Sequence, residues 1–208
     1  YPKTIDNDIK ISFANGADAI FIPSTEDIFP PNNTNIKFLK ASIKLSSVLC
    51  GLNRIGHFDG VCTVVYRLLD LIKPKNLYLG EKDWQQLLIL KDLILTKKLN
   101  VSIKSIPTQR DYDGVPLSSR NVNLSKNERK LIRFFSNNLL LAKRNFQKEK
   151  KISLKEIIQK LSAERISIEY LEHLHPYTLQ KARDEDNISM LAGAIKCGET
   201  RLIDHVFL

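Results

Sequence analysis

The segment Gly80-Glu81-Lys82-Asp83 combines residue types that could bind a phosphate group. It lies between an apolar stretch, predicted to be a buried strand, and a predicted helix, and open α/β sheets bind ligands at such strand ends. Gly80 would let the backbone approach a ligand closely, and the helix N-terminus would offer unpaired N–H groups. Lys82 would add a mobile positive charge. An ordinary helix start with acidic first-turn residues has the same pattern, so the tetrapeptide alone leaves both interpretations open.

A second polar segment, Leu117-Ser118-Ser119-Arg120-Asn121, places two hydroxyl groups beside a guanidinium group. Serine hydroxyls donate to phosphate oxygens, and the planar fork of an arginine matches two such oxygens at once. The alternative is a polar loop that leads into a helix, which is the favoured interpretation when the segment is considered alone. A phosphate site requires this segment to lie near Lys82 in space.

Four more residues could contact a small molecule. Arg54 is a candidate partner for a carboxylate or a phosphate. His57 precedes a predicted helix, where a histidine is more often a capping or packed residue than a catalyst. Gln85 and Gln86 carry amides that can bind a hydroxy acid, and a polar pair on a buried helix is otherwise hard to place. The remaining histidines lack the spacing of a metal site.

The formal net charge of +9 has three interpretations. A basic surface could bind nucleic acid. However, no basic motif interleaved with aromatic residues and no known nucleic-acid module accompanies the lysines, so a lysine-rich surface is favoured and no nucleic-acid partner is predicted. A site for anionic small molecules would need only a few well-placed cations.

Cysteine content and hydropathy favour a cytoplasmic protein. The three cysteines are widely spaced and form neither a disulfide framework nor a Cys-x-x-Cys metal pair, which fits a reducing compartment. The longest apolar helical stretch, at residues 61–72, is interrupted by Arg67 and Asp70 and is too short to cross a bilayer. We therefore predict no membrane association.

The elements that would position these residues alternate between helix and short apolar strand up to residue 106. Apolar residues of the segment 61–72 recur with the period of a helix, which Pro74 ends. Strand–helix–strand order predicts a parallel sheet with helices on its faces. The expected helices cover residues 4–15, 61–72 and 84–97, the expected strands 19–22, 76–79 and 101–106, and an extended segment 36–41.

The pattern changes after Pro107, where helices are followed by strands. Ser125 with Glu128 and Ser153 with Glu156 have the spacing of capping boxes that begin helices. The expected strands cover residues 166–170, 190–195 and 201–208. This order predicts a smaller α+β lobe, so we expect an α/β fold with domains at residues 1–110 and 111–208.

Several short motifs occur in a fixed order along the whole chain. Their order is more specific than any one of them. They are Tyr1-Pro2-Lys3-Thr4, Arg54-Ile55-Gly56-His57-Phe58-Asp59-Gly60-Val61, Gly80-Glu81-Lys82-Asp83-Trp84-Gln85-Gln86-Leu87, Pro107-Thr108-Gln109-Arg110, Asp113-Gly114, Leu117-Ser118-Ser119-Arg120-Asn121 and Thr200-Arg201-Leu202-Ile203-Asp204.

In this order the motifs resemble those of pantothenate synthetases. The resemblance implies a Rossmann-like nucleotidyltransferase parallel sheet with a C-terminal lobe, and a homodimer. It also implies an ATP-dependent and magnesium-dependent ligase of pantothenate biosynthesis, on the route to coenzyme A. ATP and pantoate would give pantoyl-adenylate and pyrophosphate, and β-alanine would then displace AMP.

The resemblance also implies site residues at matched positions. Lys82, Ser118, Ser119 and Arg120 would be the catalytic set, which fits chemistry that needs cations and N–H donors around a phosphorus centre. Gln86 would bind pantoate, with Arg54 and Tyr1 near pantoate and pyrophosphate. The ATP-binding residues would be Gly80, Glu81, Lys82, Asp83, Gln109, Leu117, Ser118, Ser119 and Arg120.

Departures from the family pattern limit this expectation. The family's first strand, its His-x-Gly-His phosphate motif and its Gln-Phe pantoate loop would all precede Tyr1, so we expect this chain alone to be inactive. Some family members continue into a fused cytidylate kinase, which is an open alternative here. Trp84 replaces a tyrosine and Ile55 a proline. The magnesium ligands are unassigned, with Asp6 and Asp8 as guesses.

Two other functions stay open at this point. Leu117-Ser118-Ser119-Arg120 is also similar to the mobile phosphate loop of other adenylate-forming nucleotidyltransferases, such as class I aminoacyl-tRNA synthetases, although no anticodon-binding domain is present. A basic nucleic-acid-binding module is the second alternative. Its affinity would fall steeply with salt and would not depend on Lys82.

Overall fold

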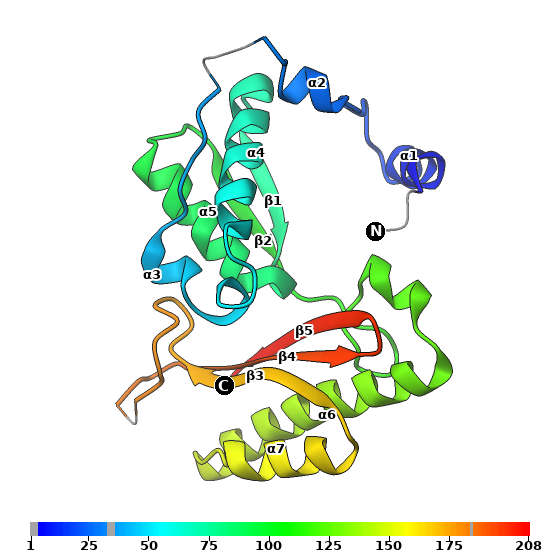
Figure 1. The fold of residues 1–208 in the computed structure, drawn as a ribbon, viewed down its shortest axis with the longest axis vertical. Coiled ribbons are helices and arrows are strands. Elements are labelled where there is room, and N and C mark those ends of the chain that lie inside the picture. Colours follow the sequence, from blue (N-terminus) through cyan, green and yellow to red (C-terminus); the bar gives the residue numbers. More distant parts are fainter. Residues whose placement is uncertain (1–3, 33–35, 184) are drawn as a thin grey trace.

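The predicted strand–helix–strand unit forms the core of the upper lobe (Figure 1). In the computed structural model, which describes residues 4–32, 36–183 and 185–208, β1 (Asn76–Gly80) pairs in parallel with β2 (Ser102–Ile106). The crossover between these strands is α5 (Trp84–Thr96), and α4 (His57–Ile72) packs beside it. The α/β class is therefore confirmed in this lobe.

Helix α5 is buried around most of its circumference because both lobes cover it. Ile89, Leu90 and Leu93 pack with residues of α4, whereas Leu87 and Leu88 pack against the C-terminal sheet. Burial of large aliphatic side chains stabilises a fold by about 2 kcal/mol each. The same helix thus holds the two lobes together.

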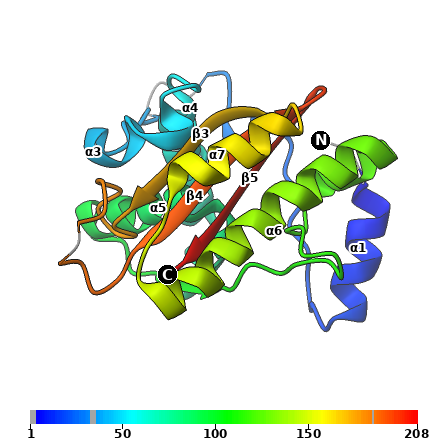
Figure 2. The same ribbon diagram turned by 90° about the horizontal axis from the view of Figure 1, so that it is seen from below.

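The lower lobe is an antiparallel sheet of β3 (Ser167–Leu174), β4 (Met190–Cys197) and β5 (Thr200–Phe207), with β4 in the centre. The helices α6 (Lys126–Glu149) and α7 (Leu154–Ala163) cover one face of it (Figure 2). Because side chains alternate along a strand, β4 directs Leu191 to α6 and α7 and Met190 to α5. Each face of this sheet thus belongs to a different hydrophobic core.

The remaining elements are short, apart from the first helix. The capping box that the sequence predicts at Ser125 is present, and a second one begins α2 at Ser24. No helix in the described part of the chain is long and apolar enough to span a membrane. The remaining helices are α1 (Ile5–Ala14), α2 (Thr25–Ile28) and α3 (Ile43–Ser46), with 3-10 turns η1 (Leu49–Gly51), η2 (Glu81–Asp83) and η3 (Ser119–Asn123).

The strand expected at residues 19–22 is wrong. This segment has no strand conformation, and Phe21 and Ile22 are more than half exposed. A strand forms only where a neighbour accepts its backbone hydrogen bonds, and no described strand lies beside this segment. The segment at residues 36–41 forms no strand, and Thr63 and Asp59 of α4 accept the backbone N–H groups of Leu39 and Ala41 at 2.9 Å.

Replacing Gly193 tests how closely α6 packs on β4. A Cβ at this position would lie 2.9 Å from the ring of Phe135 and 3.1 Å from Leu171. We expect Gly193→Ala to lower the free energy of unfolding by about 1–3 kcal/mol in urea titrations, because the core would be overpacked. The control Gly60→Ala, in α4 with open space around it, should raise it by about 1 kcal/mol. Equal stability of Gly193→Ala and the unsubstituted protein would contradict the packing described here.

Candidate active site

A cleft of about 270 Å³ lies where the start of α5 faces the C-terminal sheet. Its walls come from η1, the N-termini of α4 and α5, the segment 117–120 and all three strands of the sheet. The structure therefore brings the two polar segments of the sequence into one cavity. The residues expected from the sequence that line it are Arg54, Lys82, Asp83, Gln86, Leu117, Ser118, Ser119 and Arg120.

Four expected residues are not found among those that line the cleft. Gly80 ends β1 with a φ of −72°, and Glu81 begins η2 beside it. The side chain of Gln109 donates to Pro107 O at 3.1 Å, and its carbonyl accepts from Leu117 N at 2.9 Å. Tyr1 lies outside the described residues.

The N-terminus of α5 is fixed to the lower lobe by Trp84. Its indole Nε1 donates to the carbonyl of Pro176 at 2.7 Å, and its ring packs edge-on against Phe207 at 4.9 Å between centroids. This buried contact sets the distance between Lys82, just before the helix, and the strands opposite. Lys82 itself makes no hydrogen bond or ion pair with another described residue, so its amino group is available to a ligand.

Gln85 has a structural role that differs from the one expected. Its Nε2 donates to the carbonyls of Leu45 and Val48 at 2.8 and 2.7 Å, and its Oε1 accepts from Cys50 N at 3.1 Å. These contacts satisfy buried backbone groups and hold the segment 45–50 against α5. Gln86 also lines the cleft, and its expected contact with a hydroxy acid stays a prediction.

A buried ion pair positions the loop that leads to residues 117–120. Arg110 donates from both terminal nitrogens to Asp204 at 2.8 and 2.7 Å, and also to the carbonyls of Gly114 and His205. The side chain of Asp204 is 1% exposed. Loss of one partner would leave a buried charge uncompensated, at a cost of about 3–5 kcal/mol.

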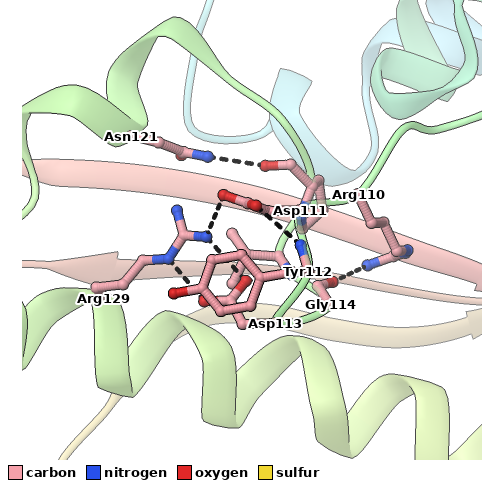
Figure 3. Close-up of polar contacts among 9 residues, drawn as sticks. Arg110, Asp111, Tyr112, Asp113, Gly114, Asn121 and Arg129 are labelled. Atoms are coloured by element: carbon pink, nitrogen blue, oxygen red, sulfur yellow. Dashed lines mark hydrogen bonds and ion pairs between the residues drawn. The ribbon is translucent and has the colours of Figure 1, made fainter.

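The same loop is held from the other side by α6 (Figure 3). Arg129 contacts Asp111 at 2.7 Å and Asp113 through two hydrogen bonds of 2.8 Å. The Arg129 guanidinium lowers the pKa of Asp113 below its usual value. Just beyond the loop, Asn121 donates to Pro116 O at 3.0 Å. These contacts hold the segment before Ser118 in place and thereby position the hydroxyls of Ser118 and Ser119, together with Arg120, at the cleft.

The electrostatic character of the cleft is cationic. Arg54, Lys82, Arg120 and Arg201 line it, with Asp83 and Asp204 as the acidic residues. The pKa of His57 lies below its usual value because of burial and the nearby charges of Arg54 and Arg201. An anionic ligand that also has apolar parts would fit this cavity, since Phe58, Trp84 and Met190 complete its walls.

The described residues do not form a protein-only metal centre. Within residues 4–32, 36–183 and 185–208, no three His, Cys, Asp or Glu side chains are grouped so that they could hold a metal ion. Asp6 and Asp8 lie exposed on α1. Magnesium is commonly held by one or two carboxylates together with substrate phosphates, and Asp83 is a residue of the cleft that fits this mode.

Sequence reasoning missed several residues of the cleft. Three of them, Cys50, Tyr170 and His205, belong to no motif, and Arg201 belongs to the closing motif at residues 200–204 without an expected role in binding. Strand alternation could have placed Arg201 and His205 on one face of β5, but not opposite α5. Their position depends on how the sheet packs across the lobes.

Comparisons with known proteins are consistent across the whole chain. A family model described as Pantoate-beta-alanine ligase matches residues 1–207. A protein named "Bifunctional pantoate ligase/cytidylate kinase" from Prochlorococcus marinus (strain MIT 9215) is 85% identical over 208 residues, 100% of this chain and 41% of that relative. The chain thus spans 41% of the length of this relative.

Two solved structures share the fold. Pantothenate synthetase from Thermus thermophilus superposes with a TM-score of 0.88 at 32% identity, over 99% of this chain and 75% of that chain. Pantoate-beta-alanine ligase from Francisella tularensis, complexed with beta-gamma ATP and beta-alanine, gives 0.79 at 33% identity, over 99% and 70%. The α/β nucleotidyltransferase-like fold expected from the sequence is thereby confirmed.

The buried ring of His205 predicts how stability changes with pH. Burial, with the charges of Arg110 and Lys82, lowers its pKa from 6.5 to about 4. Between pH 6.5 and pH 4, His205 binds a proton in the unfolded chain but not in the folded chain. The free energy of unfolding therefore falls as the pH is lowered toward 4. We expect this residue to contribute a loss of up to about 2 kcal/mol between pH 7 and pH 5.

Urea titrations at several pH values, on the unsubstituted protein and on His205→Gln, measure this contribution. The difference between the two free energies of unfolding should change with pH between 6.5 and 4 and should be constant above pH 7. A constant difference over the whole range would show that His205 titrates alike in the folded and unfolded chains.

Proposed function

The chain belongs to the pantoate-beta-alanine ligase family, and we propose that its cleft is part of an active site that joins pantoate to β-alanine with consumption of ATP. In the first step the pantoate carboxylate attacks the α-phosphorus of ATP and pyrophosphate leaves. In the second step the amine of β-alanine attacks the acyl carbon and AMP leaves. Because the chain spans 41% of the Prochlorococcus relative, the proposal concerns the full-length protein.

The observation that supports this proposal most strongly is the shared cleft of Lys82 and residues 117–120. Carboxylate attack on a phosphate brings two anions together and builds negative charge at phosphorus. A catalyst for this step must orient the two reactants and supply cations and hydrogen-bond donors. Lys82, Ser118, Ser119 and Arg120 form such a set around one cavity.

The substrates follow from the family and from the chemistry of the cleft. The Francisella tularensis relative is described as complexed with ATP, in a beta-gamma form, and with beta-alanine. We propose that Lys82 and residues 117–120 contact the phosphates, that Gln86 and Arg54 contact pantoate, and that Gly80, Glu81 and Gln109 shape the nucleotide site through their backbone. Tyr1 keeps its proposed place near pantoate.

Other parts of the assignment are proposals as well. We infer that magnesium enters with ATP and that Asp83 is a protein carboxylate of the cleft within reach of it. We also propose that the protein is a homodimer in the cytoplasm and that its domain boundary lies near residue 110. Neither another nucleotidyltransferase nor a nucleic-acid-binding module is supported by the matches found for this chain.

Replacing Lys82 tests the proposed phosphate contact. We expect Lys82→Ala in the full-length protein to slow pantoate-dependent ATP–pyrophosphate exchange by at least about a hundredfold, because a preorganised charge near the reacting phosphate is lost. Lys104→Ala, on the exposed part of β2, is the control and should exchange at the normal rate. Normal exchange by a folded Lys82→Ala variant would remove the lysine from the mechanism.

Omission of each substrate tests the reaction itself. AMP release from ATP should require both pantoate and β-alanine for multiple turnovers, whereas pyrophosphate exchange should require pantoate alone. AMP formation that does not depend on pantoate would refute the ligase assignment.

A further inference from the structure

Arg201 of β5 is a cation of the cleft that does not belong to the proposed phosphate-binding set. Its side chain is 19% exposed, and its Nε donates to Oε2 of Glu169 at 2.8 Å. Its Nη2 donates to Sγ of Cys50 at 3.4 Å. Glu169 belongs to β3 and Cys50 to η1, so the guanidinium group is held from both lobes.

Arg201 retains the capacity to bind a ligand. An arginine carries five N–H donors, which is more than the contacts of Arg201 with Glu169, Cys50 and the hydroxyl of Tyr170 use, and a thiol is a weak acceptor. The hydroxyl of Tyr170, which also lines the cleft, lies 3.3 Å from Sγ of Cys50. Burial, followed by the neighbouring Cys50, raises the pKa of Tyr170, so the hydroxyl stays protonated at neutral pH and can donate as well.

Arg54 and Arg201 act on a different histidine of the cleft from Lys82. Burial lowers the pKa of His57, and the charges of Arg54 and Arg201 lower it further. Lys82 instead acts, together with Arg110, on His205. Arg201 is joined to the phosphate loop through its own carbonyl, which accepts from Nη1 of Arg120 at 3.4 Å.

Pantoate and β-alanine each carry a carboxylate, and the two carboxylates have different roles in the proposed reaction. The carboxylate of pantoate must attack phosphorus, and a fixed ion pair between this carboxylate and an arginine would reduce its nucleophilicity. The proposed contact of Arg54 with pantoate would therefore involve the hydroxyl groups of this hydroxy acid. The carboxylate of β-alanine keeps its charge through both steps. A buried anion of that kind requires a lasting, hydrogen-bonded partner.

Building on the proposed function, we propose that Arg201 binds the carboxylate of β-alanine, with the hydroxyl of Tyr170 as a second donor. Glu169 is then a positioning residue, because its ion pair fixes the guanidinium group without contacting the substrate. The amine end of β-alanine would extend from this point toward the adenylate that Lys82 and the loop hold.

The first test is steady-state kinetics of the full-length protein with Arg201→Met. The KM for β-alanine should rise by about tenfold to a hundredfold, as expected for the loss of a charge-assisted hydrogen bond. This increase should exceed any change in the KM for pantoate or ATP by at least about fivefold. Arg201→Lys keeps the charge without the planar fork and should fall between the two proteins.

A matched control separates binding from folding. Arg67→Met removes an arginine of similar exposure, 21%, which pairs with Asp70 outside the cleft, and it should leave all three KM values unchanged. Glu169→Gln keeps the shape of the positioning residue and should raise the KM for β-alanine by less than Arg201→Met does. If Arg201→Met fails to fold, Arg201→Lys and Glu169→Gln carry the comparison.

The second test uses β-alanine amide, which carries the same amine without the carboxylate. The unsubstituted protein should prefer β-alanine over the amide in kcat/KM, and the Arg201 variants should lose most of that preference. An intact preference in folded variants, or a selective rise in the KM for pantoate or ATP, would overturn the proposal. Absence of pantoate-dependent pyrophosphate exchange in the unsubstituted protein would instead refute the proposed function, so the two failures are distinguishable.

Discussion

The ion pair between Arg110 and Asp204 is the constraint on which the geometry of the cleft depends. It joins the segment that leaves the parallel sheet to the last strand of the chain, and the carboxylate is almost fully buried. Separation of these two side chains would be costly, because each charge would then be left without compensation in a buried environment. With β5 and the loop fixed to each other, Ser118 and Arg120 line the same cavity as the residues of β5. The contacts of Arg129 add a second support from α6.

Much of the fold could be predicted from the sequence because its local signals agree. The helix that Pro74 ends, the capping box of Ser125 and the strands around Gly198 are all present within a few residues of the expected bounds. The strand expected at residues 19–22 failed because apolar composition alone does not provide a pairing partner. Propensity describes a segment, whereas a sheet is a property of several segments.

The sequence predicted the site residues that belong to motifs, but not those that reach the cleft only because the two lobes pack together. Lys82 and Ser118 stood out because a lysine at a strand–helix turn, and paired serines beside an arginine, have the donors that phosphate oxygens accept. Gln85 resembled a ligand-binding amide, yet it satisfies backbone groups of the segment 45–50, and no sequence pattern separates these two uses. Arg201 belongs to a predicted strand, and the sequence does not show that this strand faces α5.

The central strand β4 also has a consequence for synthesis on the ribosome. Nearly all of its residues are buried, between α5 on one face and the pair α6 and α7 on the other. Helix α5 ends at Thr96, whereas β4 begins at Met190. Until that strand emerges, Leu87 and Leu88 lack the apolar neighbours that β4 contributes, Met190 and Ala192, and exposed apolar surfaces favour aggregation of nascent chains. The apolar surface of the upper lobe is therefore synthesised before the strand that covers it and before the cleft can form.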